Sequence, residues 1–122
     1  MARILVIDDD PMARDIVVEI LSQKGHQAVE ACNGRQGLEQ FHNADFDLVI
    51  TDIIMPDVEG IETIIQLRKD KPDVKIIAIS GGGKISAYSH LSLAEKFGVK
   101  KTLAKPFSKA DLLTAVDELL AI

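Results

Sequence analysis

Short apolar runs alternate along the chain with longer segments in which apolar residues recur at helical spacing. Three of the runs consist almost entirely of branched apolar residues: ILVI at 4–7, LVI at 48–50 and IIAI at 76–79. A strand buried on both faces of a parallel sheet has this composition, without alternation. Two further segments, HQAVEA at 26–31 and VKKTLA at 99–104, mix polar and apolar residues, as edge strands do. The pattern therefore predicts three central strands and two edge strands.

The segments between these strands have the periodicity of amphipathic helices. The first helix is expected to begin after Asp10, a suitable cap, with Pro11 in its first turn and Gly25 at its end. Its apolar face is expected to contain Ala13, Ile16, Val17, Ile20 and Leu21. Further helices are expected over 34–43, 58–69 and 86–97. The last helix begins at Ser108, with Asp111 as its partner in a capping box.

Strands that alternate with helices in this way form a doubly wound sheet with right-handed crossovers. Because the first, third and fourth strands are the most apolar, the order 2-1-3-4-5 is expected, the flavodoxin-like (βα)5 arrangement of the α/β class. A chain of 122 residues is long enough for one domain with its own core, so 1–122 are expected to form a single domain.

The composition excludes some partners and compartments. A net charge of −5 disfavours direct binding of nucleic acid, whose phosphates attract clusters of Lys and Arg. The one cysteine, Cys32, cannot form an internal disulfide, and a cytoplasmic protein is expected. No apolar run approaches the roughly 18 residues that cross a bilayer. The start, MARILVIDDD, turns acidic too early for a signal peptide, so no membrane association is expected.

Polar residues follow the predicted strands at the edge of the sheet where parallel strands end. They are Asp8, Asp9 and Asp10 after the first strand, Asp52 after the third, Ser80 and Gly81 after the fourth, and Lys105 after the fifth. The first and third strands flank the topological switch point, where ligands of such sheets bind. Taken alone, an Asp or Ser at such a position is usually a turn or a cap, and a Lys before Pro is usually solvated. Their meeting at one edge predicts a site with four carboxylates, one hydroxyl and one ammonium group.

Carboxylates that share a site repel one another, and a divalent cation relieves that repulsion. Oxygen ligands suit Mg²⁺, which typically binds one or two carboxylates together with phosphate oxygens. Zinc is not expected, because no His or Cys lies at these strand ends. Lys105 adds a positive charge that can pair with a phosphoryl group.

These residues and their neighbours resemble the receiver domains of two-component response regulators, the CheY-like proteins, over essentially the whole chain. The matching stretches are ILVIDDD, LVITDIIMP with Asp52 and Pro56, IIAIS ending in Ser80, and LAKPF with Lys105 and Pro106. The set, in this order and spacing, is specific, whereas each piece alone is weak. The bond between Lys105 and Pro106 is also expected to be cis, which costs little before proline.

The resemblance implies a role for each of these positions. Asp52 would accept a phosphoryl group from a sensor histidine kinase or a histidine phosphotransfer protein, forming an aspartyl phosphate. The implied ligands of Mg²⁺ are Asp9 and Asp52 directly, Asp8 through a water molecule, and the backbone carbonyl of Ile54. The implied contacts of the phosphoryl group are Lys105, the Ser80 hydroxyl and the Gly81 amide. The protein would be a phosphoacceptor that assists its own phosphorylation and dephosphorylation rather than an enzyme.

Phosphorylation in this family shifts a population of conformations and changes the surface of helix four, strand five and helix five, where a downstream protein binds. The switch pairs a hydroxyl, here Ser80, with an aromatic residue on strand five. The sequence departs from that pattern, because Thr102 stands at the aromatic position. The loop after Ser80, with its three glycines, is therefore expected to carry more of the signal. A stand-alone receiver is expected, either monomeric or weakly dimeric when phosphorylated.

Two other readings of the same residues are open at this point. A phosphatase of the haloacid dehalogenase type would use Asp8 and Asp10, although the only late acidic pair, Asp117 and Glu118, falls inside the last helix and there is no room for a cap domain. A flavodoxin-like mononucleotide binder would share the fold, but three aspartates after the first strand would repel its phosphate. The stretch GGGKIS does not have the Gly-Lys-Ser/Thr order of a P-loop.

Overall fold

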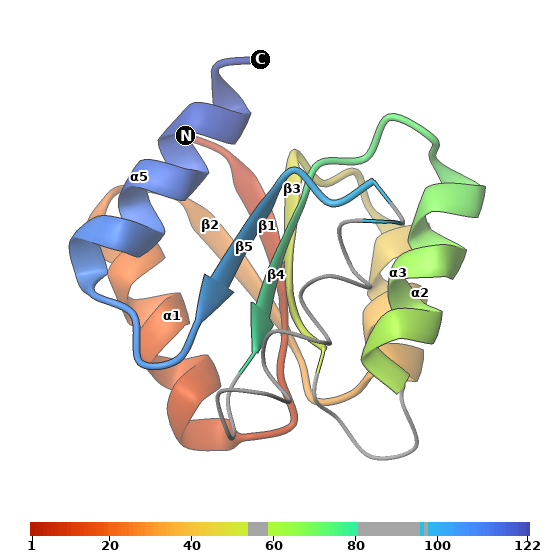
Figure 1. Cartoon of the computed structure of the whole chain (residues 1–122), viewed down its shortest axis with the longest axis horizontal. Helices are drawn as coiled ribbons and strands as arrows, with labels where there is room; N and C mark the ends of the chain where they lie inside the picture. The colour runs from red at the N-terminus through yellow and green to blue at the C-terminus, as the bar shows by residue number, and fades with distance from the viewer. Residues whose placement is uncertain (54–58, 81–95, 97) are drawn as a thin grey trace.

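The computed structural model describes residues 1–53, 59–80, 96 and 98–122 and contains a central parallel sheet of five strands (Figure 1). The strands are β1 (Arg3–Ile7), β2 (Gln27–Ala31), β3 (Leu48–Asp52), β4 (Ile76–Ser80) and β5 (Lys101–Ala104). Their order in the sheet is β2-β1-β3-β4-β5, and every neighbouring pair is parallel. The expected strands, their order and the flavodoxin-like arrangement are confirmed.

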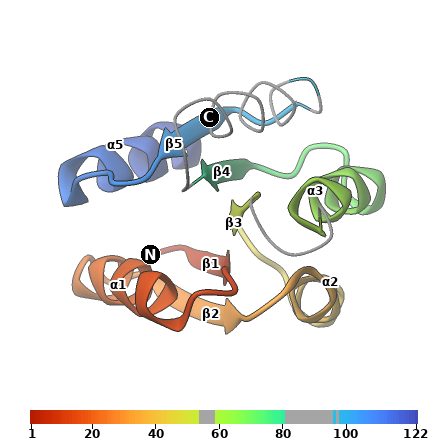
Figure 2. The same cartoon turned by 60° about the horizontal axis from the view of Figure 1, so that its bottom comes forward.

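Helices cover both faces of this sheet. They are α1 (Pro11–Gln23), α2 (Gly34–Asn43), α3 (Glu59–Asp70) and α5 (Lys109–Leu120). Figure 2 shows α1 and α5 on one face of the sheet and α2 and α3 on the other. The helix expected over 86–97 lies outside the described residues, apart from Lys96.

The core has two layers because successive residues of a strand point to opposite faces of the sheet. In β1, Leu5 and Ile7 belong to the layer under α2 and α3, whereas Ile4 and Val6 belong to the layer under α1 and α5. Each of these four side chains is at most 1% exposed. Burial on both sides explains why the central strands read as continuous apolar runs. It also makes their carboxyl ends fixed points on which a site can be built.

One expectation about α1 is wrong. The sequence pattern places Ile16 on the face against the sheet, but in the structure it is 56% exposed. The residues that α1 buries completely are Val17 and Leu21, which are four positions apart and therefore on one face. Ile16 precedes Val17 by one residue, so it lies about 100° around the helix, toward solvent.

The helix ends follow the local signals in the sequence. The Asp10 side chain accepts a hydrogen bond from the Met12 amide at 3.0 Å and caps α1, and Gly25 beyond its end has a φ of 83°. Ser108 and Asp111 form the expected capping box at the start of α5, with each side chain bonded to the other residue's amide. Both helices therefore begin at positions set by a few polar atoms.

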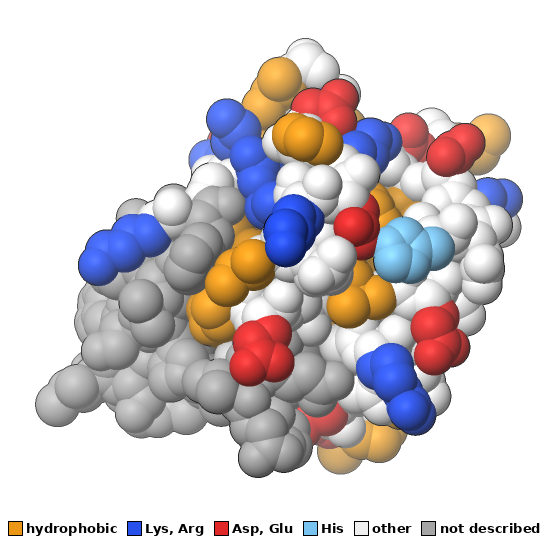
Figure 3. Space-filling view, turned by 90° about the vertical axis from the view of Figure 1, so that its right-hand side faces the viewer, with side chains coloured by type: hydrophobic (Ala, Val, Ile, Leu, Met, Phe, Trp, Pro, Cys, Tyr) orange, Lys and Arg blue, Asp and Glu red, His pale blue; other side chains and the backbone are white. Residues whose placement is uncertain are grey.

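The outer surface of α2 and α3 carries charges of both signs. Figure 3 shows acidic and basic side chains interspersed over the described part of this face, with only small hydrophobic areas between them. Such a mixture lacks the single-sign field that attracts nucleic acid. None of the helices in the described part of the chain is long and apolar enough to cross a membrane.

Candidate functional site

Three carboxylates meet where β1 and β3 end. These strands are neighbours, with Ile7 beside Thr51, so the residues that follow them share one edge of the sheet. Asp8 and Asp52 are each 4% exposed, and Asp9 is exposed. One carboxylate oxygen from each of the three lies within 4.8 Å of the others. The structure therefore brings together three of the four carboxylates that strand order and residue type predicted, without Asp10.

Lys105 reaches this cluster from the end of β5. Its Nζ lies 3.1 Å from Oδ2 of Asp52 and 3.2 Å from Oδ2 of Asp8, so one ammonium group bridges two buried carboxylates. Burial lowers the pKa of Lys105, but the charges and hydrogen bonds of Asp52 and Asp8 outweigh that effect and raise the pKa above its ordinary value. Lys105 is therefore held in its charged form. The peptide bond between Lys105 and Pro106 is cis, as expected.

The loop that carries Asp8 is held on several sides. The Asp8 amide donates to the carbonyl of Ala31 on β2 at 3.1 Å, and its Oδ1 accepts from the Asp10 amide at 2.9 Å. The Asp8 carbonyl accepts from Nη1 of Arg14 at 2.8 Å. With Oδ2 paired to Lys105, both carboxylate oxygens of Asp8 already have a partner. Asp10 lies outside the cluster of three and serves as the cap of α1.

The donor set fits a hard divalent cation. Three carboxylates and one ammonium group leave an excess of negative charge at the cluster, and no His or Cys belongs to it among the described residues. Asp9, which is exposed, can reach a cation that enters from solvent. Oxygen ligands of this kind are those of Mg²⁺ or Ca²⁺ and not those of zinc.

The remaining expected site residues lie partly or wholly outside what the structure describes. Ile54 and Gly81 are outside the described residues, and so is the side chain of Ser80. The backbone of Ser80 ends β4 beside Ala104 of β5. Because β4 also pairs with β3, Ser80 comes directly after Ile79, the residue that lies beside Asp52. Its position in the sheet therefore agrees with the prediction, while its contact with the site stays a prediction.

Comparison with known proteins identifies the family. Residues 4–117 match the response regulator receiver domain. The chain belongs to this family. It is 32% identical to the chemotaxis protein CheY of Thermotoga maritima over 117 residues, which cover 95% of each protein. It is 34% identical to the sensor kinase CckA of Brucella abortus, of which it spans only 12%.

Solved structures of receivers have the same fold. A CheY-like receiver domain protein from Methanospirillum hungatei superposes with a TM-score of 0.90 at 30% identity, covering 99% of this chain and 94% of that one. The response regulator TrrA of Thermotoga maritima, solved in complex with Mg²⁺ and BeF, gives a TM-score of 0.83 at 36% identity, covering 98% and 99%. Receivers are phosphoacceptor regulators and not conventional catalysts. The alternative of a phosphatase based on Asp8 and Asp10 is not favoured.

Thr102 of this receiver faces a hollow between β5 and α5. The hollow has a volume of about 240 Å³ and is lined by Lys101, Thr102, Leu103, Asp111, Thr114, Ala115 and Glu118. Thr102 is half-buried, and Lys101 forms an ion pair with Glu118 across the rim. The small side chain expected to replace an aromatic residue is thus found at a surface depression.

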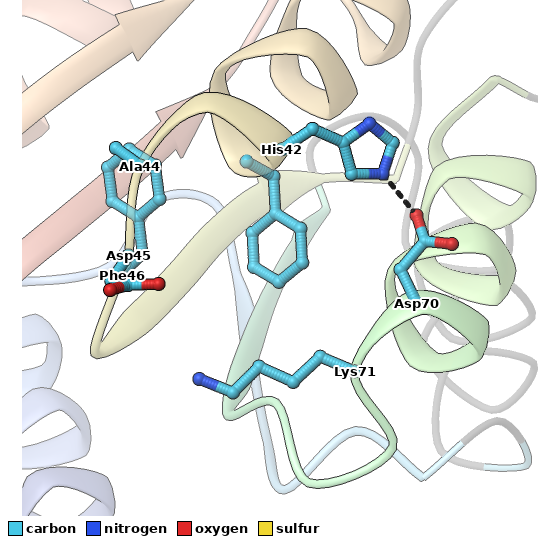
Figure 4. Close-up of a pocket in the computed structure, with 7 residues that line it drawn as sticks. His42, Ala44, Asp45, Phe46, Asp70 and Lys71 are labelled. Carbon is cyan, nitrogen blue, oxygen red and sulfur yellow. Dashed lines mark hydrogen bonds and ion pairs between the residues drawn. The ribbon is translucent and has the colours of Figure 1, made fainter.

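A second hollow lies at the far edge of the sheet. It measures about 250 Å³ and lies at the ends of α2 and α3 (Figure 4). His42, in the last turn of α2, points toward Asp70 at the end of α3, with Nε2 and Oδ2 2.6 Å apart. The hydrogen bond from His42 is the main cause that lowers the pKa of Asp70. This pair ties the two helices together at the end opposite the carboxylate cluster.

The sequence did not single out Arg14 or the cap of α2. Asn33 accepts a hydrogen bond from the Gln36 amide at 2.8 Å, and an Asn directly before a helical pattern is a signal that could have been used. Arg14 gives no such signal, because its partners, the backbone carbonyl of Asp8 and the side chain of Glu30, come beside it only in the folded chain.

Proposed function

We propose that Asp52 accepts a phosphoryl group in a Mg²⁺-dependent transfer from a phosphohistidine. The observation that carries this proposal is a buried carboxylate at the end of β3 that is paired with Lys105 at 3.1 Å and has two further carboxylates beside it. A lone buried aspartate paired with a lysine would be an ordinary structural ion pair. Asp8 shares Lys105 with Asp52, so among the described residues three carboxylates meet one ammonium group, and this excess of negative charge points to a cation.

Asp9 and Asp52 would hold the Mg²⁺ ion directly, with the backbone carbonyl of Ile54 as a further ligand. Asp8 would contribute its charge without direct ligation, because Lys105 and the Asp10 amide already engage its two oxygens. When bound, the ion neutralises the negative charge that develops on the phosphoryl oxygens during transfer. The solved complex of the related TrrA contains Mg²⁺ and BeF, which supports Mg²⁺ as the ion here.

The transfer itself uses the side chains of this chain as follows. A carboxylate oxygen of Asp52 attacks phosphorus in line with the phosphorus–nitrogen bond of the donor, and that bond breaks. The electron pair of the broken bond stays with the imidazole nitrogen of the donor, which then takes up a proton. Lys105, freed from Asp52 as the carboxylate becomes an acyl phosphate, would pair with a phosphoryl oxygen. The Ser80 hydroxyl and the Gly81 amide would hold other phosphoryl oxygens.

The donor would be a sensor histidine kinase or a histidine phosphotransfer protein. A sensor kinase is among the relatives, and receivers are the targets of such kinases. The surface made by β5 and α5 would be the output face, with Thr102 as part of the switch. The hollow beside Thr102 supports this assignment, because a depression with an ion pair at its rim can accept a side chain of a partner.

Phosphorylation by acetyl phosphate tests the acceptor directly. The purified protein is incubated with acetyl phosphate and Mg²⁺, and intact mass spectrometry measures the gain of one phosphoryl group. Wild type and Asp45→Asn, an exposed carboxylate that precedes β3, are expected to gain it. Asp52→Asn is expected to lose it. Retention of an acid-labile phosphate in Asp52→Asn, with loss only in Asp8→Asn, would overturn the proposal in favour of the phosphatase chemistry.

A further inference from the structure

The guanidinium group of Arg14 connects three parts of the chain beside the carboxylate cluster. Arg14 lies in the first turns of α1, and its side chain is 17% exposed. Nη1 donates to the backbone carbonyl of Asp8 at 2.8 Å, and Nε donates to Oε1 of Glu30 on β2 at 3.1 Å. A single rigid fork thus joins α1, the end of β1 and the end of β2.

The carbonyl that Arg14 holds belongs to the peptide unit between Asp8 and Asp9. A peptide unit is planar, so holding its carbonyl restricts both ψ of Asp8 and φ of Asp9, and φ of Asp9 sets the direction in which its side chain leaves the backbone. The other polar groups of Asp8 are held by Ala31, Asp10 and Lys105. Arg14 holds the carbonyl group of Asp8, which is part of the peptide unit that leads to Asp9.

We propose that Arg14 is a positioning residue that sets the direction of the Asp9 carboxylate and thereby the affinity of the cluster for Mg²⁺. This inference rests on the proposed function, since it concerns the same cation. Arg14 does not touch the cation, because a positive charge would be repelled by it. It acts through the peptide unit of Asp8 and Asp9, as outer residues of metal sites act through the ligands they hold.

The sign of the effect separates this role from a purely electrostatic one. Arg14 places a positive charge 2.8 Å from the backbone carbonyl of Asp8, so removing its charge alone would strengthen the binding of Mg²⁺ nearby. Loss of positioning would weaken the binding of Mg²⁺. The Asp9 side chain would be free to adopt several directions before binding, and fixing it in one direction costs entropy. A residue that only stabilises the fold would leave the affinity of the folded protein unchanged.

The experiment measures Mg²⁺ affinity by titration with MgCl₂, without any phosphoryl donor. Amide NMR shifts of residues 8–10 report binding, and thermal unfolding reports whether each variant is folded. Arg14→Met keeps the apolar stem and removes both hydrogen bonds, and its affinity is expected to fall about tenfold. Arg14→Lys keeps the charge but loses the planar guanidinium group with its several donors, and this variant is expected to bind Mg²⁺ several-fold more weakly than wild type.

Glu30→Gln is the matched control, because the amide oxygen can still accept from Nε while the charge changes by one unit. Its affinity is expected to stay within about twofold of wild type, since the Glu30 side chain is 44% exposed and its charge is screened by solvent. Equal or tighter binding by folded Arg14→Met overturns the proposal, and if that variant does not fold, wild-type affinity in Arg14→Lys overturns it. Absence of Mg²⁺ binding by wild type would instead refute the proposed function.

Discussion

Replacement of Lys105 by methionine tests how the buried carboxylates are held together in the absence of metal. Methionine keeps most of the aliphatic stem and removes the ammonium group, which lies 3.1 Å from Asp52 and 3.2 Å from Asp8. The variant leaves two carboxylates with side chains 5% exposed and no cation between them. We expect the folded state to be destabilised when Mg²⁺ is absent.

The magnitude follows from the two distances. At an effective dielectric constant of about 20, each contact has a Coulomb attraction of roughly 5 kcal/mol. The variant recovers the cost of burying an ammonium group and the entropy of holding its side chain, and water can partly reach the carboxylates. The net loss in the free energy of unfolding is therefore expected to be about 2 to 3 kcal/mol.

The pH dependence has a definite sign. The pKa of Lys105 is raised in the folded protein, so its contribution to stability is complete below its unfolded pKa and declines as the pH rises through the folded value. A measurement at pH 7 therefore records the full contribution of Lys105.

Urea unfolding at pH 7, in EDTA and again in saturating MgCl₂, measures the effect. The matched control is Lys109→Met, whose ammonium group donates to the neutral Oε1 of Gln23 at 3.1 Å. In EDTA, Lys105→Met is expected to be the less stable variant. In MgCl₂ the difference from wild type is expected to shrink, because the cation replaces the missing charge. Equal stability of the two variants in EDTA, or a loss that Mg²⁺ does not reduce, would refute the reasoning.

Two further predictions concern the close packing of Gly60 against Ile53 and the contact between His42 and Asp70. Gly60→Ala is expected to destabilise the protein by about 1 to 3 kcal/mol in urea unfolding, although alanine favours helix, because the added Cβ would lie 2.6 Å from the carbonyl oxygen of Ile53; a gain in stability would contradict this close approach. His42→Ala is expected to raise the pKa of Asp70 toward its ordinary value in an NMR titration, since His42 is the main cause of its lowering. The stability from this carboxylate is present above its unfolded pKa and lost as the pH falls through the lower folded value. An unchanged titration of Asp70 would rule out the His42 contact as the cause.

Much of the site could be predicted because parallel strands impose a common geometry. Asp8, Asp52 and Lys105 are far apart in sequence, yet each lies at or directly after the end of a strand, and all strands of a parallel sheet end at one edge. Residue type and strand order were therefore enough to place their side chains together. The exposure of Ile16 was not predicted correctly, because a short helix with several apolar residues allows more than one rotation on the sheet.

Contacts made by backbone carbonyls could not be predicted in the same way. Arg14 reads as one more charged residue on an amphipathic helix, and its partners, the Asp8 carbonyl and Glu30, are fixed only when α1 packs beside β2. The same limit applies to Gly60. A side chain does not fit at this position because α3 lies so close to the backbone of Ile53, directly after β3. Such features depend on distances between elements, which a pattern of residue types does not contain.

The cluster of Asp8, Asp9 and Asp52 also has a consequence for how this sequence can change. Helix caps, core layers and strand order agree with one another along the chain. The three carboxylates lie within 4.8 Å of one another and share the single ammonium group of Lys105 among the described residues, so their excess of negative charge weakens folding when no metal ion is bound. They form a locally frustrated site in an otherwise consistent fold. A laboratory selection for heat resistance alone should therefore enrich neutral residues at these three positions early, and each such gain in stability would come with a loss of signalling.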